Sequence, residues 1–501
     1  MMLNPYEEVP YPGRAFPQTH PDRLAVIAKL FGMDPAPPER CRVLELGCGD
    51  GGNLIPMAYT LPDSQFTGLD LAPGAIERAR SFASRLGLSN LTFIAADLQD
   101  FEATGLAREP FDFIIAHGLY SWVPAPVQDK LLAIAGSSLS AQGVAYVSYN
   151  ACPGALMRNI VRQILLYHTR RLPTPQKKME EARKFLKFAA NWPMVSGEYR
   201  MFLAIEAKEL LGRHPSVLYH DTLAEYNEPV WFHEFAHRAA THNLQYLGDS
   251  DFHLMRVAQF PADGPDVPDL PKWPDEILEW EQYVDIVLCR WFRKTLLCRA
   301  SVPLDRSLSP ALVFGFRCAS DLAPKDSSGP VEGAGRVEFV SGLGKSCSVT
   351  TDYLLGKAAL LELREVWPDS YPFEELFRRA TDRVGKAPEA QGQTPSELAS
   401  FLLRLFSANM VEFRLQRSPF TIHPGDRPIS SRLARFQAES GDMIATLNHR
   451  MLEITDERSR KLLLRLDGTR DRDAIAREFD ESVGHVTAGI EALARLALLE
   501  S

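Results

Sequence analysis

The stretch VLELGCGDGGN, residues 43–53, places four glycines directly after a run of mainly apolar residues. An acid, Glu45, stands two residues before the first of them, Gly47. Glycines at the end of a strand let backbone N–H groups and the next helix N-terminus come close to a ligand, because no Cβ stands in the way. Several nucleotide-like cofactors are bound by such a turn, so the glycines alone predict a nucleotide-like ligand without saying which.

The chain on both sides of this turn alternates between strand and helix patterns. An initial helix is predicted to begin at Pro21, because apolar residues recur at helical spacing after it. Strands are then predicted at 42–47, 66–71, 91–97, 111–118 and 143–150, with helices at 53–61, 73–88 and 127–139. This alternation indicates right-handed βαβ units, so the predicted fold class is α/β with a Rossmann-like parallel sheet.

The spacing of the glycines narrows the choice of ligand. Dinucleotide-binding enzymes carry GxGxxG, in which the helix dipole faces a pyrophosphate, whereas residues 47–51 read GxGxG. An acid beside the pocket, Glu45, would repel a pyrophosphate but attract an ammonium or sulfonium group. A NAD-dependent oxidoreductase is therefore a remote alternative. Cys48, inside the turn, is interpreted as a small filler rather than a nucleophile.

Polar residues stand at the ends of three further predicted strands. Asp70 ends the second strand about twenty residues after the turn, where an acid accepts from ribose hydroxyls in nucleotide-binding folds. Asp97 ends the third strand, placed to accept from an adenine amino group, and His117 ends the fourth. Because the carboxyl ends of parallel strands share one edge of the sheet, these groups are expected to surround one ligand.

The sequence resembles the successive motifs of class I S-adenosylmethionine (SAM) dependent methyltransferases at ELGCGDG, at LD 69–70, at AAD 95–97 and at FDFIIAHG. The resemblance covers roughly residues 40–155 and implies that SAM is the cofactor. It also implies that the glycines line the methionine part, while the two aspartates hold the ribose and the adenine. The residues expected at the cofactor are Glu45, Gly47, Cys48, Gly49, Gly51, Asn53, Asp70, Leu71, Asp97, Leu98, His117, Gly118, Tyr11 and His20.

A second resemblance extends over most of the chain. The sequence is similar to methyltransferases with a so-called methyltransferase regulatory domain in FPQTHPDR, SYNACPG, YNEPVWFHEFAHRAATHNLQYLG and LCRWFRKTLLC. That group includes bacterial protein lysine methyltransferases that modify outer-membrane proteins in rickettsiae, and these are dimers with added helical domains. The resemblance therefore implies a protein substrate and a homodimer. Tyr11 and His20 would close over the cofactor, although such N-terminal arms are also often inert.

Candidates to orient an amine acceptor follow the fourth and fifth predicted strands: Tyr120, Trp122, Tyr149 and Asn150. Asn150 offers a carbonyl oxygen, and aromatic rings can wall a narrow channel and attract a cation. Tyr149 also fits a core position, because it lies two residues from Val147 on an alternating strand. SYNACPG lacks the Asn-Pro-Pro sequence of methyltransferases that act on nucleic-acid bases. This difference weakens the hypothesis that the protein methylates a base.

The rest of the chain reads as mainly helical. Residues 275–300 are predicted as one helix, 244–249 as a short strand, and the Pro/Gly/Ser-rich 321–339 as a linker or exposed loop. The tail, with helices around a DGT turn, suits a winged-helix-like module. The predicted domains are an N-terminal arm and helix (1–40), a SAM-binding core (41–155), a helical, regulatory and dimerisation region (156–320), a linker and middle region (321–400) and a winged-helix-like C-terminal domain (401–501).

Composition and charge argue against several other classes. A net charge of −9 argues against a general affinity for nucleic acid. Seven scattered cysteines without a CxxC pair predict reduced thiols and no structural zinc site. No apolar run approaches the ~20 residues of a membrane span, so a cytoplasmic protein is expected. His220, Asp221, His233 and Glu234 do not follow HExxH, so no metal is predicted there.

Together these patterns favour a SAM-dependent N-methyltransferase that modifies protein lysines, with envelope or outer-membrane proteins as substrates. Two alternatives stay open. One is a methyltransferase acting on a small molecule or natural product, and the other is a SAM-binding regulatory protein without catalysis.

Overall fold

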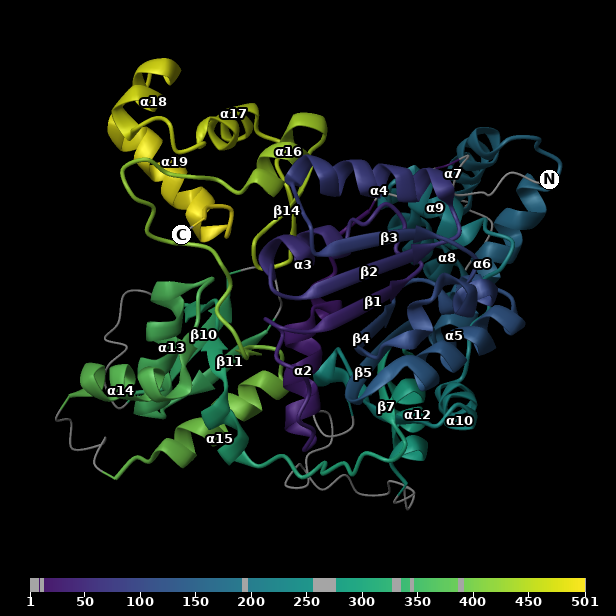
Figure 1. Cartoon of the computed structure of the whole chain (residues 1–501), viewed down its shortest axis with the longest axis horizontal. Coiled ribbons are helices and arrows are strands. Elements are labelled where there is room, and N and C mark those ends of the chain that lie inside the picture. Colours follow the sequence, from purple (N-terminus) through teal and green to yellow (C-terminus); the bar gives the residue numbers. More distant parts are fainter. Residues whose placement is uncertain are drawn as a thin grey trace.

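The computed structural model describes Val9 and residues 13–191, 197–255, 276–326, 335–342, 347–385 and 392–500. A seven-stranded sheet lies at the centre of the molecule, in the order β3-β2-β1-β4-β5-β7-β6 (Figure 1). Its first five strands are β1 (Arg42–Leu46), β2 (Gln65–Asp70), β3 (Leu91–Ala95), β4 (Phe111–Ala116) and β5 (Leu139–Asn150). These five pair in parallel, which confirms the predicted sheet.

Helices cover both faces of the sheet, because neighbouring residues of a strand point to opposite sides. In β1, Val43 packs into one core and Leu44 into the other. The first core receives α2 (Pro21–Leu30), α3 (Leu54–Thr60) and α4 (Pro73–Leu86), and the second receives α5 (Ala125–Ser138) and α10 (Phe232–Thr241). The helix predicted from Pro21 and the three helices predicted between the strands are therefore confirmed.

The sheet is completed by β6 (Leu244–Asp249) and β7 (Phe292–Arg299), which both pair antiparallel to their neighbours. The strand predicted at 244–249 is thus confirmed, whereas the single helix predicted over 275–300 is wrong. That segment forms α12 (Ile277–Val287), turns, and continues as β7. Cys289, with φ of 47°, ends the helical path, and hydrogen bonding on both edges of β7 then outweighs the helical spacing of the apolar residues.

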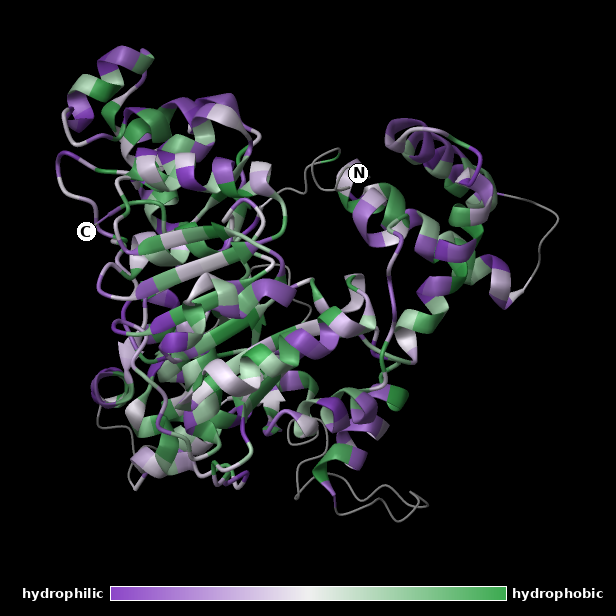
Figure 2. Cartoon of the chain, turned by 45° about the vertical axis from the view of Figure 1, so that its right-hand side comes forward, coloured by the Kyte–Doolittle hydropathy of each residue, from purple (hydrophilic) through white to green (hydrophobic). Residues whose placement is uncertain are grey.

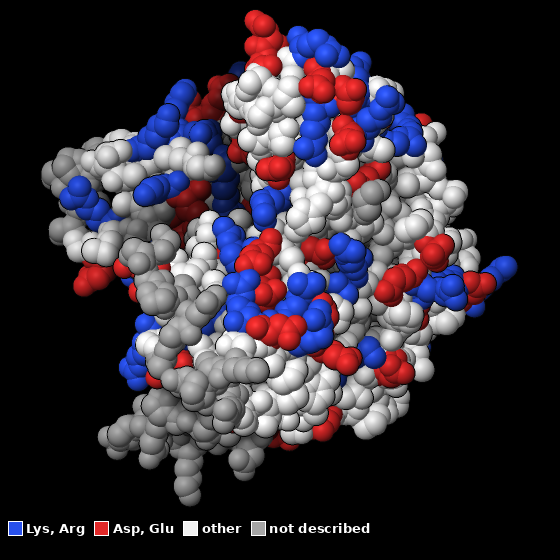
Figure 3. Space-filling view, turned by 90° about the vertical axis from the view of Figure 1, so that its left-hand side faces the viewer, with Lys and Arg blue, Asp and Glu red and all other residues white. Residues whose placement is uncertain are grey.

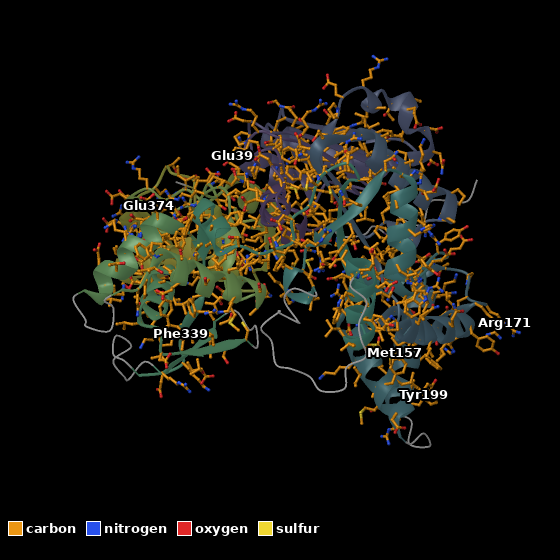
Figure 4. The ribbon with its side chains drawn as sticks, turned by 90° about the horizontal axis from the view of Figure 1, so that it is seen from below. Glu39, Met157, Arg171, Tyr199, Phe339 and Glu374 are labelled. Carbon is orange, nitrogen blue, oxygen red and sulfur yellow. The ribbon has the colours of Figure 1, made fainter. Side chains whose placement is uncertain are left out.

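Four helices form a lobe beside the sheet: α6 (Gly154–Thr169), α7 (Pro175–Asn191), α8 (Glu198–Gly212) and α9 (Pro215–Thr222). They enclose an apolar cluster of their own, around residues such as Leu165, Leu186 and Leu210. Figure 2 shows this lobe apart from the apolar strands of the sheet. Figure 4 places Met157 and Tyr199 on it, at the opposite end of the molecule from Phe339.

The middle region forms two small antiparallel sheets. One contains β8 (Arg317–Ala319), β12 (Tyr371–Pro372) and β13 (Glu412–Arg414), and the other β9 (Leu322–Pro324), β10 (Val337–Ser341) and β11 (Ser348–Thr351). The helices packed with them are α13 (Leu354–Val366), α14 (Phe373–Val384) and α15 (Pro395–Ser407). Both ends of the expected linker 321–339 are therefore strands, and Phe339 is fully buried.

The C-terminal domain begins with α16 (Arg432–Ser440) and a hairpin of β14 (Met443–Ala445) and β15 (Met451–Glu453). Three helices follow, α17 (Glu457–Arg465), α18 (Arg472–Phe479) and α19 (Val483–Arg495), around one apolar core. The domain packs against α4, where the ring of Phe436 in α16 stacks on the ring of Phe82 with centroids 4.5 Å apart (Figure 1).

The surface of the middle region and C-terminal domain carries charges of both signs. Figure 3 shows basic and acidic side chains interspersed on this face. Many of them form ion pairs, such as Arg383 with Glu362 at 2.6 Å. Among the helices of the described ranges, none has both the length and the apolar character needed to cross a membrane.

Candidate functional site

The glycine turn after β1 has one tightly packed side and one open side. Gly47, Gly49 and Gly51 all have positive φ, at 74°, 55° and 77°. A Cβ on Gly51 would lie 2.6 Å from the Phe93 ring, so packing against β3 requires that glycine. A Cβ on Gly49 would meet no atom of the described residues within 4 Å. Gly49 therefore presents bare backbone to open space, as a ligand-binding turn requires.

Two predicted acids hold backbone groups at the same sheet edge. Asp70 accepts hydrogen bonds from the Gly49 N–H and the Ala72 N–H, each at 2.8 Å. The carboxylate at the end of β2 therefore fixes the open part of the glycine turn. The apolar side chain of Leu71, next to it, is 59% exposed. Asp97 accepts from the Gln99 N–H at 2.9 Å and so caps the turn that follows β3.

Glu45 is the third acid, and it is buried beneath the turn with one oxygen unpaired. Its Oε1 accepts from Asn53 Nδ2 at 2.7 Å, while its Oε2 has no hydrogen-bond partner among the described residues. Burial raises the pKa of Glu45 to about 8, against the opposing effect of the Asn53 hydrogen bond. A carboxylate in this position is stabilised by a positive charge on a ligand. The arrangement supports the inference that the ligand is a cation.

Cys48, between Gly47 and Gly49, is buried, and burial holds the pKa of its thiol well above the ordinary value. Its Sγ lies where a side chain on Gly68 of β2 would need to be. The side chain of Leu98 is also buried, after Asp97. The interpretation of Cys48 as a filler agrees with this placement.

The N-terminal arm reaches the site through Asn53. Asn53 Oδ1 accepts from the Phe16 N–H at 3.0 Å, and Asn53 Nδ2 donates to Thr19 Oγ1 at 3.0 Å. The Phe16 ring lies 3.9 Å from the His117 ring, measured between centroids. His20 accepts from the Asp22 N–H and caps α2. Tyr11 lies outside the described residues.

His117 and Gly118 stand at the end of β4. His117 Nδ1 is 2.9 Å from the Tyr146 hydroxyl, and Gly118 N–H donates to Ser148 Oγ at 2.8 Å. Burial and the nearby Lys294 lower the pKa of His117 to about 3, so its imidazole is neutral. A Cβ on Gly118, which has φ of 63°, would meet no atom within 4 Å in the described ranges. The site is therefore open here as well.

The residues expected on the acceptor side divide into two pairs. Asn150 donates from Nδ2 to Asn227 Oδ1 at 2.7 Å, and its backbone N–H donates to Ser121 Oγ. Trp122 is half-buried, and within the described ranges its Nε1 has no hydrogen-bond partner. Both lie where β4 and β5 end, next to the segment 226–230 that runs alongside β5.

Tyr120 and Tyr149 lie in the core instead. Both are fully buried, and both rings pack on Phe235 of α10, with centroids 5.1 Å and 4.3 Å away. The Tyr149 hydroxyl is 3.0 Å from Thr295 Oγ1 of β7. Their placement agrees with the packing alternative rather than with a wall exposed to substrate.

The histidines and acids of 220–234 are spread over two helices. His220 Nε2 is 2.6 Å from the Val9 carbonyl oxygen, and His233 Nδ1 is 2.9 Å from Gln282 Oε1. Within the part of the chain that the structure describes, no three His, Cys, Asp or Glu side chains are grouped to hold a metal ion.

Three site residues were not predicted from the sequence: Phe16, Thr19 and His449. The first two lie in FPQTHPDR, the arm motif that carried the second resemblance. His449 comes from the C-terminal hairpin, and its Nε2 lies 3.0 Å from Asn53 Oδ1. No pattern near residue 449 signals this contact, because its partner is 396 residues away.

Three families match successive parts of the chain. A methyltransferase domain matches residues 38–195, a predicted methyltransferase regulatory domain matches 214–299, and the PKMT C-terminal winged helix domain matches 426–491. The last match confirms the winged-helix-like tail.

Known proteins match over different lengths. The uncharacterized protein RP789 of Rickettsia prowazekii is 31% identical, over 98% of this chain and 88% of its own length. The structure of PKMT2 from Rickettsia typhi, in complex with AdoHcy, superimposes with a TM-score of 0.84 and 26% identity, covering 98% of this chain and all of that one. Malonyl-[acyl-carrier protein] O-methyltransferase of Anoxybacillus flavithermus is 37% identical, but only over 21% of this chain and 40% of its own length.

The residues present fit the cofactor that the fold implies. Glu45 has an unpaired buried oxygen suited to a cation, Gly49 leaves room against its backbone, and Asp70 stands at the neighbouring strand end. The order of the domains, the whole-chain likeness and this geometry agree. The chain belongs to the PKMT-type family of SAM-dependent methyltransferases, in which a methyltransferase domain is joined to a regulatory domain and a C-terminal winged helix.

Proposed function

We propose that the protein transfers the methyl group of SAM to the side-chain nitrogen of lysine in proteins, and that envelope or outer-membrane proteins are its substrates. The observation that carries the proposal is the extent of the likeness to PKMT2, which includes the helical lobe, the middle region and the C-terminal domain. The malonyl-carrier methyltransferase, by contrast, matches only about a fifth of the chain. The rest of the chain lies outside that match and is available to recognise a protein substrate.

The residues around the site suit an amine acceptor. SAM supplies an electrophilic methyl group, so the protein must mainly position the acceptor nitrogen in line and exclude water. A lysine, with an ordinary pKa of ~10.4, must arrive without its proton, and a nearby positive charge lowers its pKa. A dedicated base is therefore not required. We assign Asn150 and Trp122 to orient the amine, and Tyr120 and Tyr149 to support them from the core.

An exposed apolar surface adjoins the acceptor side and suits contact with a protein. It lies on the first turns of α6 and around the end of α12, and consists of Leu156, Met157, Ile160, Ile286, Val287 and Trp291, each between 41% and 58% exposed. Met157 Sδ of α6 lies 3.6 Å from Sγ of Cys289, two residues after α12, so the two groups of residues form one surface. Because α6 begins four residues after Asn150, this surface starts beside the proposed transfer site.

The proposal is tested with pure protein, methyl-labelled SAM and two extracts, one of outer-membrane proteins and one of soluble proteins. The expected result is label on lysine side chains of membrane-fraction proteins, located by mass spectrometry of peptides. Label on a lipid or small molecule, with no labelled protein, would support the small-molecule alternative and overturn the lysine assignment. SAM binding without any labelled product would instead support the regulatory alternative.

Replacement of Gly49 by alanine is expected to weaken SAM binding by about 10-fold, since a Cβ would stand in space that the protein leaves empty. Gly87 is a matched control at the end of α4, away from the site, because it also has positive φ and an added Cβ would likewise meet none of the described atoms within 4 Å. Each alanine should cost about 1 kcal/mol of stability from its left-handed backbone. Calorimetric titration with SAM should separate the two variants, and equal SAM affinities would refute the role of Gly49.

A further inference from the structure

The hairpin of the C-terminal domain inserts one side chain into the methyltransferase site. Between β14 and β15, residues 446–450 form a tight turn in which the His449 N–H donates to the Thr446 carbonyl oxygen at 3.0 Å. His449 is 3% exposed, and its ring lies 5.2 Å from the His20 ring of the arm. Its Nε2 reaches Asn53 Oδ1 at 3.0 Å. The C-terminal domain therefore touches the residue next to the glycine turn.

The network fixes which atoms donate. The Phe16 backbone N–H can only donate, and it points at Asn53 Oδ1, so that atom is the amide oxygen. His449 Nε2 must then carry a hydrogen to donate to the same oxygen. Burial and the facing His20 hold the pKa of His449 well below its ordinary value, so the ring is neutral. Its Nδ1 then carries no hydrogen, and it has no hydrogen-bond partner in the part of the chain that the structure describes.

The same amide connects His449 to Glu45. With its oxygen held by His449 and the arm, Asn53 must turn Nδ2 toward Glu45 Oε1, which accepts at 2.7 Å. This leaves Glu45 Oε2 as the unpaired oxygen beneath the glycine turn. Loss of the His449 contact would leave the Asn53 amide held by Phe16 and Thr19 of the arm alone, and would loosen the orientation of the Glu45 carboxylate.

The turn is built to hold His449 in an unfavourable backbone conformation. His449 has φ of 60°, which is uncommon for a residue with a side chain. The Arg450 N–H donates to Thr446 Oγ1 at 3.1 Å, and Leu447 is buried against Ala497 of the same domain, Phe420 before it and Tyr59 of α3. Backbone strain that is held in place by its surroundings is often found at functional positions.

We propose that His449 is a positioning residue through which the C-terminal winged helix domain sets the affinity of the methyltransferase site for SAM. The proposal depends on SAM binding and not on the nature of the acceptor. It is therefore tested by titration of the full-length chain with SAM, and a failure of the lysine assignment would leave it unaffected.

Two substitutions separate positioning from simple packing. In His449→Gln, the amide nitrogen is as many bonds from Cα as histidine Nε2 and can still donate to Asn53. In His449→Asn, the amide is one bond too short, although asparagine tolerates positive φ better than glutamine does. If His449 has only a structural role in the turn, the asparagine variant should bind SAM more tightly than the glutamine variant. If His449 positions Asn53, the glutamine variant should bind SAM more tightly.

The expected SAM dissociation constant is within about 2-fold of the wild-type value for His449→Gln and about 5- to 10-fold higher for His449→Asn, the effect of one lost hydrogen bond. The KM for SAM should rise in proportion to the dissociation constant, while kcat at saturating SAM should not change. Glu453→Gln, on the exposed outer strand β15, is the control. Equal affinities for the Gln and Asn variants, whether weakened or not, would overturn the proposal.

Hydrogen exchange on the wild-type chain gives a test that does not depend on a variant folding. If the hairpin raises SAM affinity, SAM must stabilise the docked hairpin by the same factor, because coupling between two sites is reciprocal. Amide exchange in residues 446–453 is therefore expected to slow when SAM binds. Unchanged exchange there, with slowed exchange in residues 45–53, would refute the coupling.

Discussion

Glu45→Gln should bind SAM at least roughly 30-fold more weakly than the wild-type protein, because removing one member of a buried charge contact costs about 2–5 kcal/mol. Glutamine keeps the shape of the side chain and can still pair with Asn53, so the glycine turn should remain folded. The loss would then reflect the missing negative charge opposite a cationic ligand. Glu39→Gln, at an exposed glutamate just before β1, is the matched control (Figure 4).

The pH dependence of binding gives this prediction a second readout. The pKa of Glu45 rises from its ordinary 4.5 to about 8 in the folded protein without ligand, so Glu45 is mostly protonated at pH 7. A cationic ligand favours the ionised form, so SAM affinity should increase as the pH rises from 7 toward 9, with release of a proton. Calorimetry in two buffers with different ionisation enthalpies should detect this proton in the wild-type protein and not in Glu45→Gln.

The raised pKa of Glu45 also makes the stability of the protein without SAM depend on pH, in a direction that can be worked out. Between about pH 4.5 and pH 8 the folded protein holds a proton on Glu45 that the unfolded chain has released. The contribution of Glu45 to the free energy of unfolding therefore falls as the pH rises through this window. Thermal unfolding of Glu45→Gln should lack this part of the decline. A parallel pH profile for the two proteins would show that Glu45 is not protonated in the folded state.

The parts of the site that could be predicted are those with local signals. The glycine turn and the acids at Asp70 and Asp97 follow strands with clear patterns, and parallel pairing brings strand ends together whatever else the chain does. Asn53 was predicted as a cofactor contact for its place in the motif. The structure shows it buried between the arm, Glu45 and His449.

What could not be predicted depends on long-range packing. His449 meets Asn53 across 396 residues, and nothing in TLNHR indicates a partner in another domain. The strand β7 could not be predicted for a related reason. Its sequence, FRKTLLCR, has apolar and basic residues that also fit a helix, and only pairing with β5 and β6 makes it a strand. A strand with a buried arginine at its second position also breaks the expected alternation.

That buried arginine, Arg293, belongs to a network of charges between β6, β7 and α12. It is fully buried, donates to Asp285 Oδ2 at 2.8 Å and to Glu281 Oε2 at 3.1 Å, and stacks over the Phe232 ring. Asp249 and Arg290 complete the network, so two arginines serve three acids. Burial raises the pKa of Asp249 above its ordinary value.

Arg293→Met should therefore lower the free energy of unfolding by about 3–5 kcal/mol, since it leaves Arg290 as the one arginine of the network for three buried acids. Arg378→Met is the control, because Arg378 forms ion pairs on the exposed surface of α14 and its loss should have a far smaller effect. Urea unfolding of both variants measures the difference.

Adding Asp285→Asn to Arg293→Met removes part of the excess negative charge around Arg290, so the double variant should recover part of the lost stability. Such recovery would show that uncompensated charge, and not lost packing against Phe232, causes the damage. Because β7 pairs with β5 opposite Asn150, the destabilised single variant should also lose acceptor methylation before it loses SAM binding. Additive losses in the double variant would contradict this account of the network.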